Sequence, residues 1–160
     1  MRAQAEHGPA TLIVLISTSR ELINEVANEL RSDENMYYLV EVSSADEAIE
    51  IANELAPEHL SLYVRDPHRY LGRVVNAGAV SLGRTPPAII DYAAGPNHIL
   101  PTNQWARFRG GLTVYDFLKP IMYANAEEPG EELVKSAMAL ARHEGFELHA
   151  RSIGVRYGWE

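Results

Sequence analysis

Four short apolar runs along the first half of the chain predict β-strands. Residues 11–17 and 37–42 are almost continuously apolar and rich in β-branched side chains, and shorter runs cover residues 60–64 and 79–83. Runs of this kind without alternation are typical of strands that are buried on both faces of a parallel sheet. We therefore expect four strands, the first of them buried on both sides.

Helical patterns separate these runs. Thr18 with Glu21 and Ser44 with Glu47 have the spacing of a capping box, and apolar residues at helical spacing follow each pair. Further helices are predicted over residues 67–76 and 85–90. The alternation of strand and helix predicts crossover units, and hence an α/β fold with a parallel sheet and flanking helices, an incomplete Rossmann-like arrangement.

The second half of the chain departs from this alternation. Residues 111–118 have strand-like character, whereas acids, proline and glycine over residues 124–130 indicate a linker. Residues 131–143 form an amphipathic helix, and the helical tail beyond it is too short to fold alone, so we expect it to dock on a second subunit. The expected organisation is an α/β domain over residues 1–123, followed by linker, helix and tail over residues 124–160.

The composition narrows the class of partner. The chain has 160 residues, of which 46% are hydrophobic and 22% charged, and its formal net charge is −8. An acidic surface repels nucleic acid and anionic membranes at long range, so the expected partner is a small molecule or another protein. No cysteine is present, so a bound metal would need His, Asp, Glu or Gln as ligands.

Two features bear on the location of the protein. No apolar run approaches the roughly 20 residues that a bilayer crossing requires. Residues 1–9 contain an acid and an imidazole where a signal peptide would be apolar. The expected location is the cytoplasm.

Residues 91–102 are the segment best suited to line a functional site. They bring together Asp91, Asn97 and His98 with a Gly-Pro break and a second proline. Such a segment is too irregular for the interior of a helix or for a central strand. It directly follows predicted buried structure, although the same residue types also collect in ordinary polar surface loops.

Two pairs of polar residues carry further candidate chemistry. Glu58 and His59 are adjacent where a helix meets a strand, and acid beside imidazole suits general acid–base catalysis, although the pair also fits a solvated loop. Gln4 and His7 lie three residues apart on a predicted helical turn and could bring an oxygen and an imidazole nitrogen to one metal ion. A frayed, solvated terminus is the alternative interpretation of that turn.

Several motifs, taken in this order along the chain, resemble those of histidinol dehydrogenases. They are Gln4-Ala-Glu-His7-Gly, Ala56-Pro-Glu-His-Leu60, Asn76-Ala-Gly-Ala79, Asp91-Tyr92 with Gly95-x-Asn97-His98-x-Leu100-Pro-Thr102, Gly111-Leu-x-Val-Tyr-Asp-Phe-Leu118 and Glu144-Gly-Phe-x-x-His149-Ala. The resemblance covers nearly the whole chain, and coincidence does not produce so many motifs in register.

The resemblance implies a zinc-dependent oxidation. Histidinol dehydrogenases convert L-histidinol to L-histidine through the aldehyde, with two NAD molecules used in succession and one zinc ion that holds the substrate. The matched zinc ligands, which would also lie against the substrate, are Gln4, His7, Asp91 and His149. Oxygen and imidazole nitrogen are suitable zinc ligands, and zinc would act here mainly as an orienting template.

The resemblance also assigns roles in catalysis and substrate binding. His59 matches the general base that takes the substrate hydroxyl proton, and Glu58 matches the residue that activates the water that hydrates the aldehyde. His98 and Glu144 match residues that contact histidinol. In the family the C-terminal segment crosses to the partner subunit, so we expect a homodimer in which Glu144 and His149 complete the neighbour's site.

Family members have considerably longer chains. The resemblance implies that an N-terminal portion and the NAD-binding domain lie outside these 160 residues, and no NAD-contacting residue is predicted among them. We therefore expect that this chain does not complete the reaction alone, being either a truncated form or one that works with a separately encoded N-terminal half. The alternatives are a non-catalytic module that binds zinc or an imidazole compound or only dimerises, and a purely structural remnant.

Overall fold

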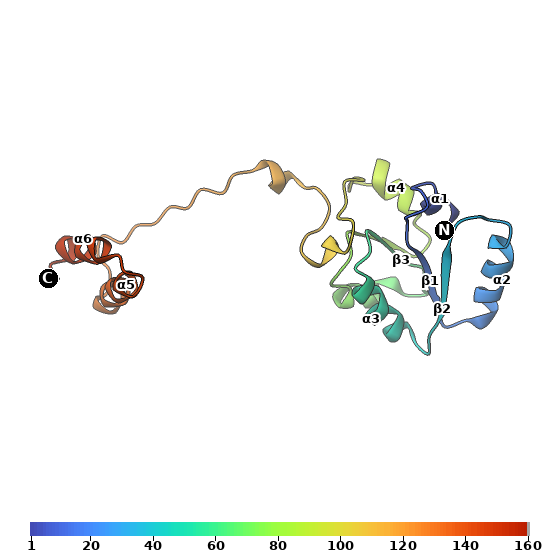
Figure 1. Cartoon of the computed structure of the whole chain (residues 1–160), viewed down its shortest axis with the longest axis horizontal. Coiled ribbons are helices and arrows are strands. Elements are labelled where there is room, and N and C mark those ends of the chain that lie inside the picture. Colours follow the sequence, from blue (N-terminus) through green and yellow to red (C-terminus); the bar gives the residue numbers. More distant parts are fainter. Residues whose placement is uncertain (160) are drawn as a thin grey trace. The chain divides into compact units, whose positions relative to one another are not determined.

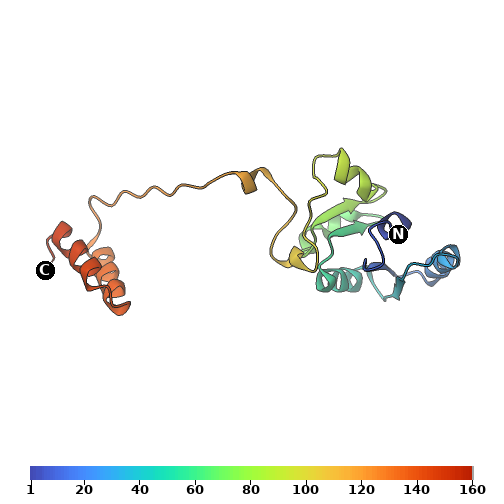
Figure 2. The ribbon, with the colours of Figure 1, turned by 45° about the horizontal axis from the view of Figure 1, so that its top comes forward.

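The computed structural model describes residues 1–159, which divide into two compact units that are described separately. The first unit covers Met1–Phe117 and the second begins at Leu118. Figure 1 labels helices α1 to α6 and strands β1 to β3, and Figure 2 shows the same ribbon from a second direction. The proposed division into residues 1–123 and 124–160 stays a prediction.

The first unit contains two pairs of parallel strands. β1 (Ile13–Ser17) pairs with β2 (Tyr37–Glu41), and β3 (His59–Leu62) pairs with β4 (Ala79–Leu82). The four predicted strands and the parallel α/β fold class are confirmed. Among the described residues the strands form two separate two-stranded sheets rather than one continuous sheet.

The prediction that β1 is buried on both faces is wrong. Only Ile13 is buried, and Val14 to Ser17 are half-buried. β1 carries one neighbouring strand, β2, among the described residues, and α2 (Arg20–Leu30) and α3 (Ala45–Leu55) pack against it. A strand with a single partner keeps one edge and part of its side chains accessible, whatever its apolar content.

The two long helices of this unit begin at serine caps. The Ser44 hydroxyl accepts a hydrogen bond from the Glu47 amide at 3.1 Å, which confirms the predicted start of α3. The predicted cap at Thr18 is wrong, because the Ser19 hydroxyl accepts from the Leu22 amide at 3.2 Å and α2 begins one residue later. β1 continues through Ser17, so the chain needs the extra residue to turn from strand into helix.

Tighter turns replace some of the predicted regular structure. Residues 67–76 were expected to form a helix, and Pro67–Arg73 form a 3₁₀ helix. Residues 111–118 were expected to be strand-like, yet Val114–Phe117 form another 3₁₀ helix. The Asp116 carboxylate accepts from the Thr113 amide at 2.7 Å, and this local side-chain bond favours a turn over an extended strand. A third 3₁₀ helix covers Trp105–Arg107.

The first unit also contains two short α-helices. α1 covers Arg2–Ala5, and α4 covers Pro87–Tyr92 and packs on β4. The larger buried apolar side chains of this unit come from strands β1 and β3, from helices α3 and α4 and from the residue after β2, and they are Ile13, Val42, Ile49, Leu62 and Ile90. The buried alanines of this unit are Ala5, Ala52, Ala56 and Ala106.

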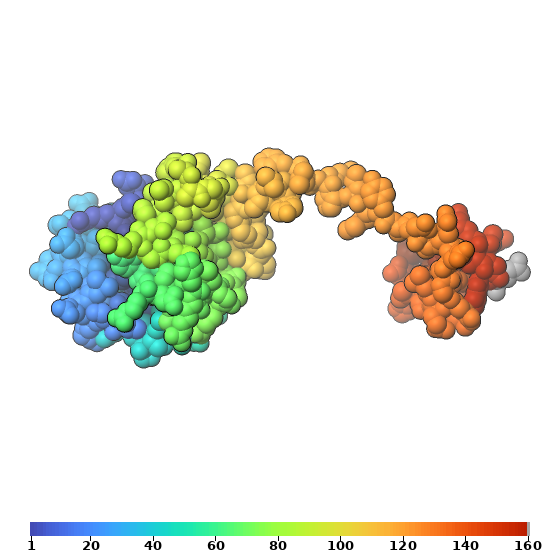
Figure 3. Space-filling model, turned by 180° about the vertical axis from the view of Figure 1, so that it is seen from behind, coloured from blue at the N-terminus to red at the C-terminus, as the bar shows by residue number. Residues whose placement is uncertain are grey.

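The second unit is a pair of packed helices. α5 covers Glu131–His143, the bounds that the sequence predicted, and α6 covers Glu147–Tyr157. Val134, Met138 and Ala150 form their common core. Every side chain over residues 118–128 is exposed. Figure 3 draws the same chain as a space-filling view, with this segment in orange. No helix within residues 1–159 combines the length and the apolar character that crossing a membrane would require.

Candidate functional site

The structure brings two of the predicted site residues together. His59 is the first residue of β3, and Asp91 lies in the last turn of α4. Nε2 of His59 is 3.5 Å from Oδ1 of Asp91, and the two side chains are only 12% and 15% exposed. β4 positions both residues, because it pairs with β3 on one side and packs against α4.

One oxygen of the Asp91 carboxylate is buried without a hydrogen bond. Among residues 1–159 its Oδ1 atom has no hydrogen-bond partner, and the His59 ring nitrogen at 3.5 Å is its ion-pair neighbour. Burying a charged oxygen without a hydrogen bond or a cation is costly, and natural proteins rarely leave one in this state. The position therefore fits a bound cation or a polar ligand group beside His59.

The backbone around Glu58 is held closely. Its carbonyl oxygen accepts from the Ala79 amide at 2.8 Å, and the Pro57 carbonyl accepts from the Gly78 amide at 2.9 Å. A Cβ atom at Gly78 would lie 2.6 Å from the Glu58 oxygen, so a side chain has no room there. These contacts fix the backbone at Glu58, directly before β3, and the side chains of Glu58 and His59 are both half-buried.

His98 lies in a loop that one asparagine organises. The Asn97 side chain accepts from the Ile99 amide at 2.9 Å and donates to the Leu112 carbonyl at 2.7 Å. The exposed His98 ring lies 6.0 Å from the Tyr92 ring, centroid to centroid, with a tilt of 34°. Asn97 also lines a cavity of about 380 Å³ together with Ile90. The sequence motif included Asn97 but did not reveal this organising role.

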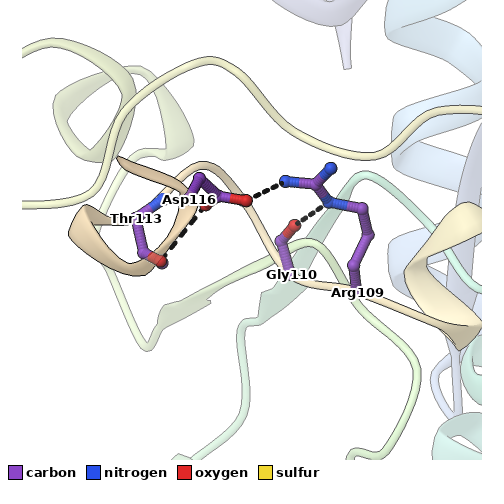
Figure 4. A pocket seen from close by; sticks show the side chains of 5 residues that line it. Arg109, Gly110, Thr113 and Asp116 are labelled. Atoms are coloured by element: carbon purple, nitrogen blue, oxygen red, sulfur yellow. Dashed lines mark hydrogen bonds and ion pairs between the residues drawn. The ribbon is translucent and has the colours of Figure 1, made fainter. Parts of the chain in front are cut away.

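A second cavity contains an ion pair to which the sequence analysis assigned no role. Arg109 Nη2 lies 3.0 Å from Asp116 Oδ1 beside a cavity of about 360 Å³ (Figure 4). The hydrogen bond from the Thr113 amide holds the pKa of Asp116 below its usual value, and Arg109 acts in the same direction. The two charges neutralise each other and stabilise the turn, so we assign the cavity no ligand.

Gln4 and His7 occupy one turn at the beginning of the chain. Gln4 lies in α1 and is half-buried, whereas His7 follows the end of the helix and is exposed. The His7 amide donates to the Gln4 carbonyl at 3.2 Å, so the helical turn that carries Gln4 continues past Ala5 as far as His7. Arg2 anchors α1 through its ion pair with Asp33, at 3.6 Å.

Glu144 and His149 belong to the second unit. Glu144 caps the C-terminus of α5, and His149 lies in the first turn of α6, where its ring packs against Phe146 at a centroid distance of 5.2 Å. Both side chains are exposed. Within residues 1–159 no three His, Cys, Asp or Glu side chains gather as a metal site. The predicted set of Gln4, His7, Asp91 and His149 contains a glutamine and spans both units, and it stays a prediction.

Comparisons with known proteins agree on one family. A family model described as histidinol dehydrogenase matches residues 1–157. Curated proteins named histidinol dehydrogenase from Sulfolobus acidocaldarius and Saccharolobus solfataricus are 62% and 59% identical to this chain over 157 residues, and the matches cover 98% of this chain and 40% and 39% of theirs. The crystal structure of histidinol dehydrogenase from Elizabethkingia anophelis matches with a TM-score of 0.83 at 27% identity, over 98% of this chain and 40% of that one. The chain thus spans about 40% of the length of the curated relatives it matches.

Proposed function

Because the chain belongs to the histidinol dehydrogenase family, we propose that it provides the zinc- and substrate-binding part of an enzyme that oxidises L-histidinol to L-histidine with NAD. The observation that carries this proposal is the approach of His59 to Asp91 at 3.5 Å, with both side chains largely buried. An imidazole and a carboxylate from separate elements, held together at the N-terminal end of β3, suit proton transfer to a bound small molecule.

The donor set suits a zinc ion. Within the part of the chain that the structure describes, the buried Oδ1 of Asp91 has no hydrogen-bond partner, which fits an atom that accepts a cation. In the proposal Gln4, His7 and Asp91 hold the metal together with His149 of the partner subunit, in a homodimer whose tails are exchanged. Bound zinc would orient the substrate through its amine and imidazole nitrogens.

His59 and Glu58 carry the proposed proton transfers. Nε2 of His59 would accept the proton of the substrate hydroxyl as the alcohol is oxidised to the aldehyde. Glu58 would then remove a proton from the water that adds to the aldehyde carbon, before the hydrate is oxidised to the carboxylate. NAD, when bound, would supply the hydride acceptor for both oxidations. The half-buried position of both side chains supports these roles, because limited water access keeps proton transfer specific.

His98 and Glu144 are the proposed substrate contacts. His98 is exposed beside Tyr92, in the loop that directly follows the helix carrying Asp91. Glu144 would contribute its carboxylate from the partner subunit, where it could accept hydrogen bonds from a cationic amine. NAD contacts are proposed to come from outside residues 1–160, and the location in the cytoplasm stays a prediction.

Zinc content and histidinol binding test this function directly. We expect one equivalent of zinc in the purified protein by elemental analysis, and saturable heat on calorimetric titration with L-histidinol. Asp91→Asn should abolish zinc binding, whereas Asp66→Asn, at an exposed aspartate, should leave it unchanged. Absence of zinc and of histidinol binding, even after zinc is added, would contradict the proposal. Zinc binding without histidinol binding would instead indicate a non-catalytic metal-binding module.

A further inference from the structure

We propose that Asn53 is a positioning residue that holds Glu58 and His59 in place through the segment over residues 73–79. The proposal rests on the function proposed above for Glu58 and His59. Asn53 lies in the last turn of α3, before the chain turns into β3. Its side-chain hydrogen bonds go to residues 73–76, so its effect on Glu58 and His59 passes through the backbone.

The Asn53 side chain makes three hydrogen bonds to one segment. Its Oδ1 accepts from the Val75 amide at 2.9 Å and from the Asn76 amide at 3.2 Å, and its Nδ2 donates to the Arg73 carbonyl at 2.8 Å. A fourth hydrogen bond runs in the opposite direction, because Asn76 Nδ2 donates to the Asn53 backbone carbonyl at 3.0 Å. Four bonds between two asparagines and one short segment fix that segment against α3.

The fixed segment leads directly to the backbone of the catalytic pair. Two residues beyond Asn76, the Gly78 amide donates to the Pro57 carbonyl at 2.9 Å, and the next amide, that of Ala79, donates to the Glu58 carbonyl at 2.8 Å. Gly78 contacts Glu58 so closely that no side chain fits between them. The position of segment 73–79 therefore sets where Glu58 and His59 lie.

The chain on the other side of Asn53 is equally constrained. Ala56 has a φ of +46°, a left-handed conformation that an alanine rarely adopts. This turn redirects the chain from α3 into Pro57 and β3, and its amide donates to the Ala52 carbonyl at 3.0 Å. Two paths of contacts connect Asn53 to Glu58. One follows the chain through Ala56, and the other crosses by hydrogen bonds to Asn76 and returns from Gly78 and Ala79. Asn53 is the residue that joins the two paths.

The test compares Asn53→Ala with two matched controls in the full chain without ligand. Asn28→Ala changes an exposed asparagine at the same place in α2, where, among residues 1–159, its Oδ1 accepts only from Arg31, three residues along the chain. Ile49→Val removes a buried methylene from α3 and lowers stability without touching the hydrogen bonds of Asn53. Amide hydrogen exchange at Gly78 and Ala79 and the NMR signals of the His59 ring are measured in each variant, with His59→Gln used to assign those signals.

We expect Asn53→Ala to speed exchange at Gly78 and Ala79 by about tenfold beyond the effect of Ile49→Val, because their local protection depends on the fixed segment. The His59 ring signals should shift in Asn53→Ala alone. Exchange rates and ring signals no different from those of Ile49→Val would overturn the proposal. The same result in Asn28→Ala as in Asn53→Ala would also overturn it, because the effect would then be general.

The failure of this proposal and the failure of the proposed function appear in different measurements. The exchange and ring signals report on positioning in the ligand-free protein. Titration of zinc-loaded wild-type protein with L-histidinol reports on function. Missing histidinol binding with a clear exchange effect would reject the function and keep Asn53 as the residue that positions His59, whereas intact binding with no exchange effect would reject Asn53 alone.

Discussion

Helices α2 and α3 have the same length and end in the same three residues, yet only α3 is built into the candidate site. Each has eleven residues, begins after a serine cap and ends in Asn-Glu-Leu. Asn28 at the end of α2 is exposed and accepts from Arg31 at 2.9 Å, whereas Asn53 at the end of α3 binds a segment twenty or more residues away. The comparison teaches that one local sequence serves as a surface turn or as an anchor, depending on what the rest of the chain places against it.

The two helices also differ in how the chain leaves them and in what they bury. α2 ends at Arg31 in the ordinary right-handed conformation, and no residue of α2 is buried. α3 ends at Ala56 in the left-handed conformation and buries Ile49 and Ala52. The chain after α2 enters the exposed turn before β2, whereas the chain after α3 enters Glu58 and His59.

Gly78→Ala should have the largest effect on stability, because it disrupts the contact between segment 73–79 and Glu58, for which α2 has no counterpart among the described residues. The added Cβ would lie 2.6 Å from the Glu58 oxygen and 2.9 Å from Pro101 Cδ. We expect a loss of about 3 kcal/mol in the free energy of unfolding, measured by urea denaturation. Gly72→Ala is the matched control, since nothing lies within 4 Å of its added carbon. A loss of unfolding free energy in Gly78→Ala no larger than that in Gly72→Ala would show that the backbone around Glu58 can shift to accommodate a side chain.

Serine-to-alanine changes at the two helix starts should show that α2 and α3 differ at their ends rather than at their beginnings. Ser19 and Ser44 each accept one amide hydrogen bond, at 3.2 and 3.1 Å. Each replacement should cost about 1 kcal/mol in urea denaturation. Ser32→Ala, at an exposed turn, serves as control. A much larger cost at Ser44 than at Ser19 would mean that the two helices already differ where they begin.

The stability of the protein should depend on pH through Glu47, in the first turn of α3. The hydrogen bonds from the Ser43 hydroxyl and then from its amide lower the pKa of Glu47. Because the folded-state pKa lies below the ordinary value near 4.5, this contribution to stability is complete above that pH and is lost as the pH falls through the lowered pKa. Ser43→Ala should raise the pKa of Glu47 and weaken this acid dependence.

The measurements for this prediction are an NMR titration of the Glu47 carboxyl and melting temperatures at neutral and acidic pH. Ser32→Ala again serves as control, because it leaves the hydrogen bonds of Glu47 intact. If the pKa of Glu47 is the same in Ser43→Ala as in the wild type, the Ser43 hydroxyl is not the cause of the lowered pKa.

Ala56→Gly should have the smallest effect, although it changes the turn that distinguishes α3 from α2. Glycine relieves a left-handed strain of about 1 kcal/mol but removes a buried methyl group worth about 0.8 kcal/mol. We expect a net change within about 0.5 kcal/mol in urea denaturation, from these opposing terms. Ala27→Gly, within the exposed face of α2, should cost about 1 kcal/mol by comparison. Equal costs at both positions would mean that the turn at Ala56 stores no strain.

The sequence predicted those features of this protein that depend on neighbouring residues. The four strands, the cap at Ser44 and the bounds of α5 follow from apolar spacing and from short-range hydrogen bonding, and the structure confirms them. Two of the errors arose where two local patterns compete, whereas the error about the burial of β1 arose from its having one neighbouring strand among the described residues. Ser19 replaced Thr18 as the cap, and the Asp116 side chain turned a strand-like run into a 3₁₀ helix. The family motifs identified the family, which the comparisons confirm.

Contacts between distant segments were decided only in three dimensions. The sequence assigned His59 and Asp91 separate roles without indicating that they meet, and it did not distinguish Asn53 from Asn28, since both sit in the same Asn-Glu-Leu ending. Local patterns encode which residues share a face of a helix or strand and which are hydrogen-bonded within a turn. They carry no information about which element lies across from a given side chain, because that depends on how the strands pair and on where the helices pack against them.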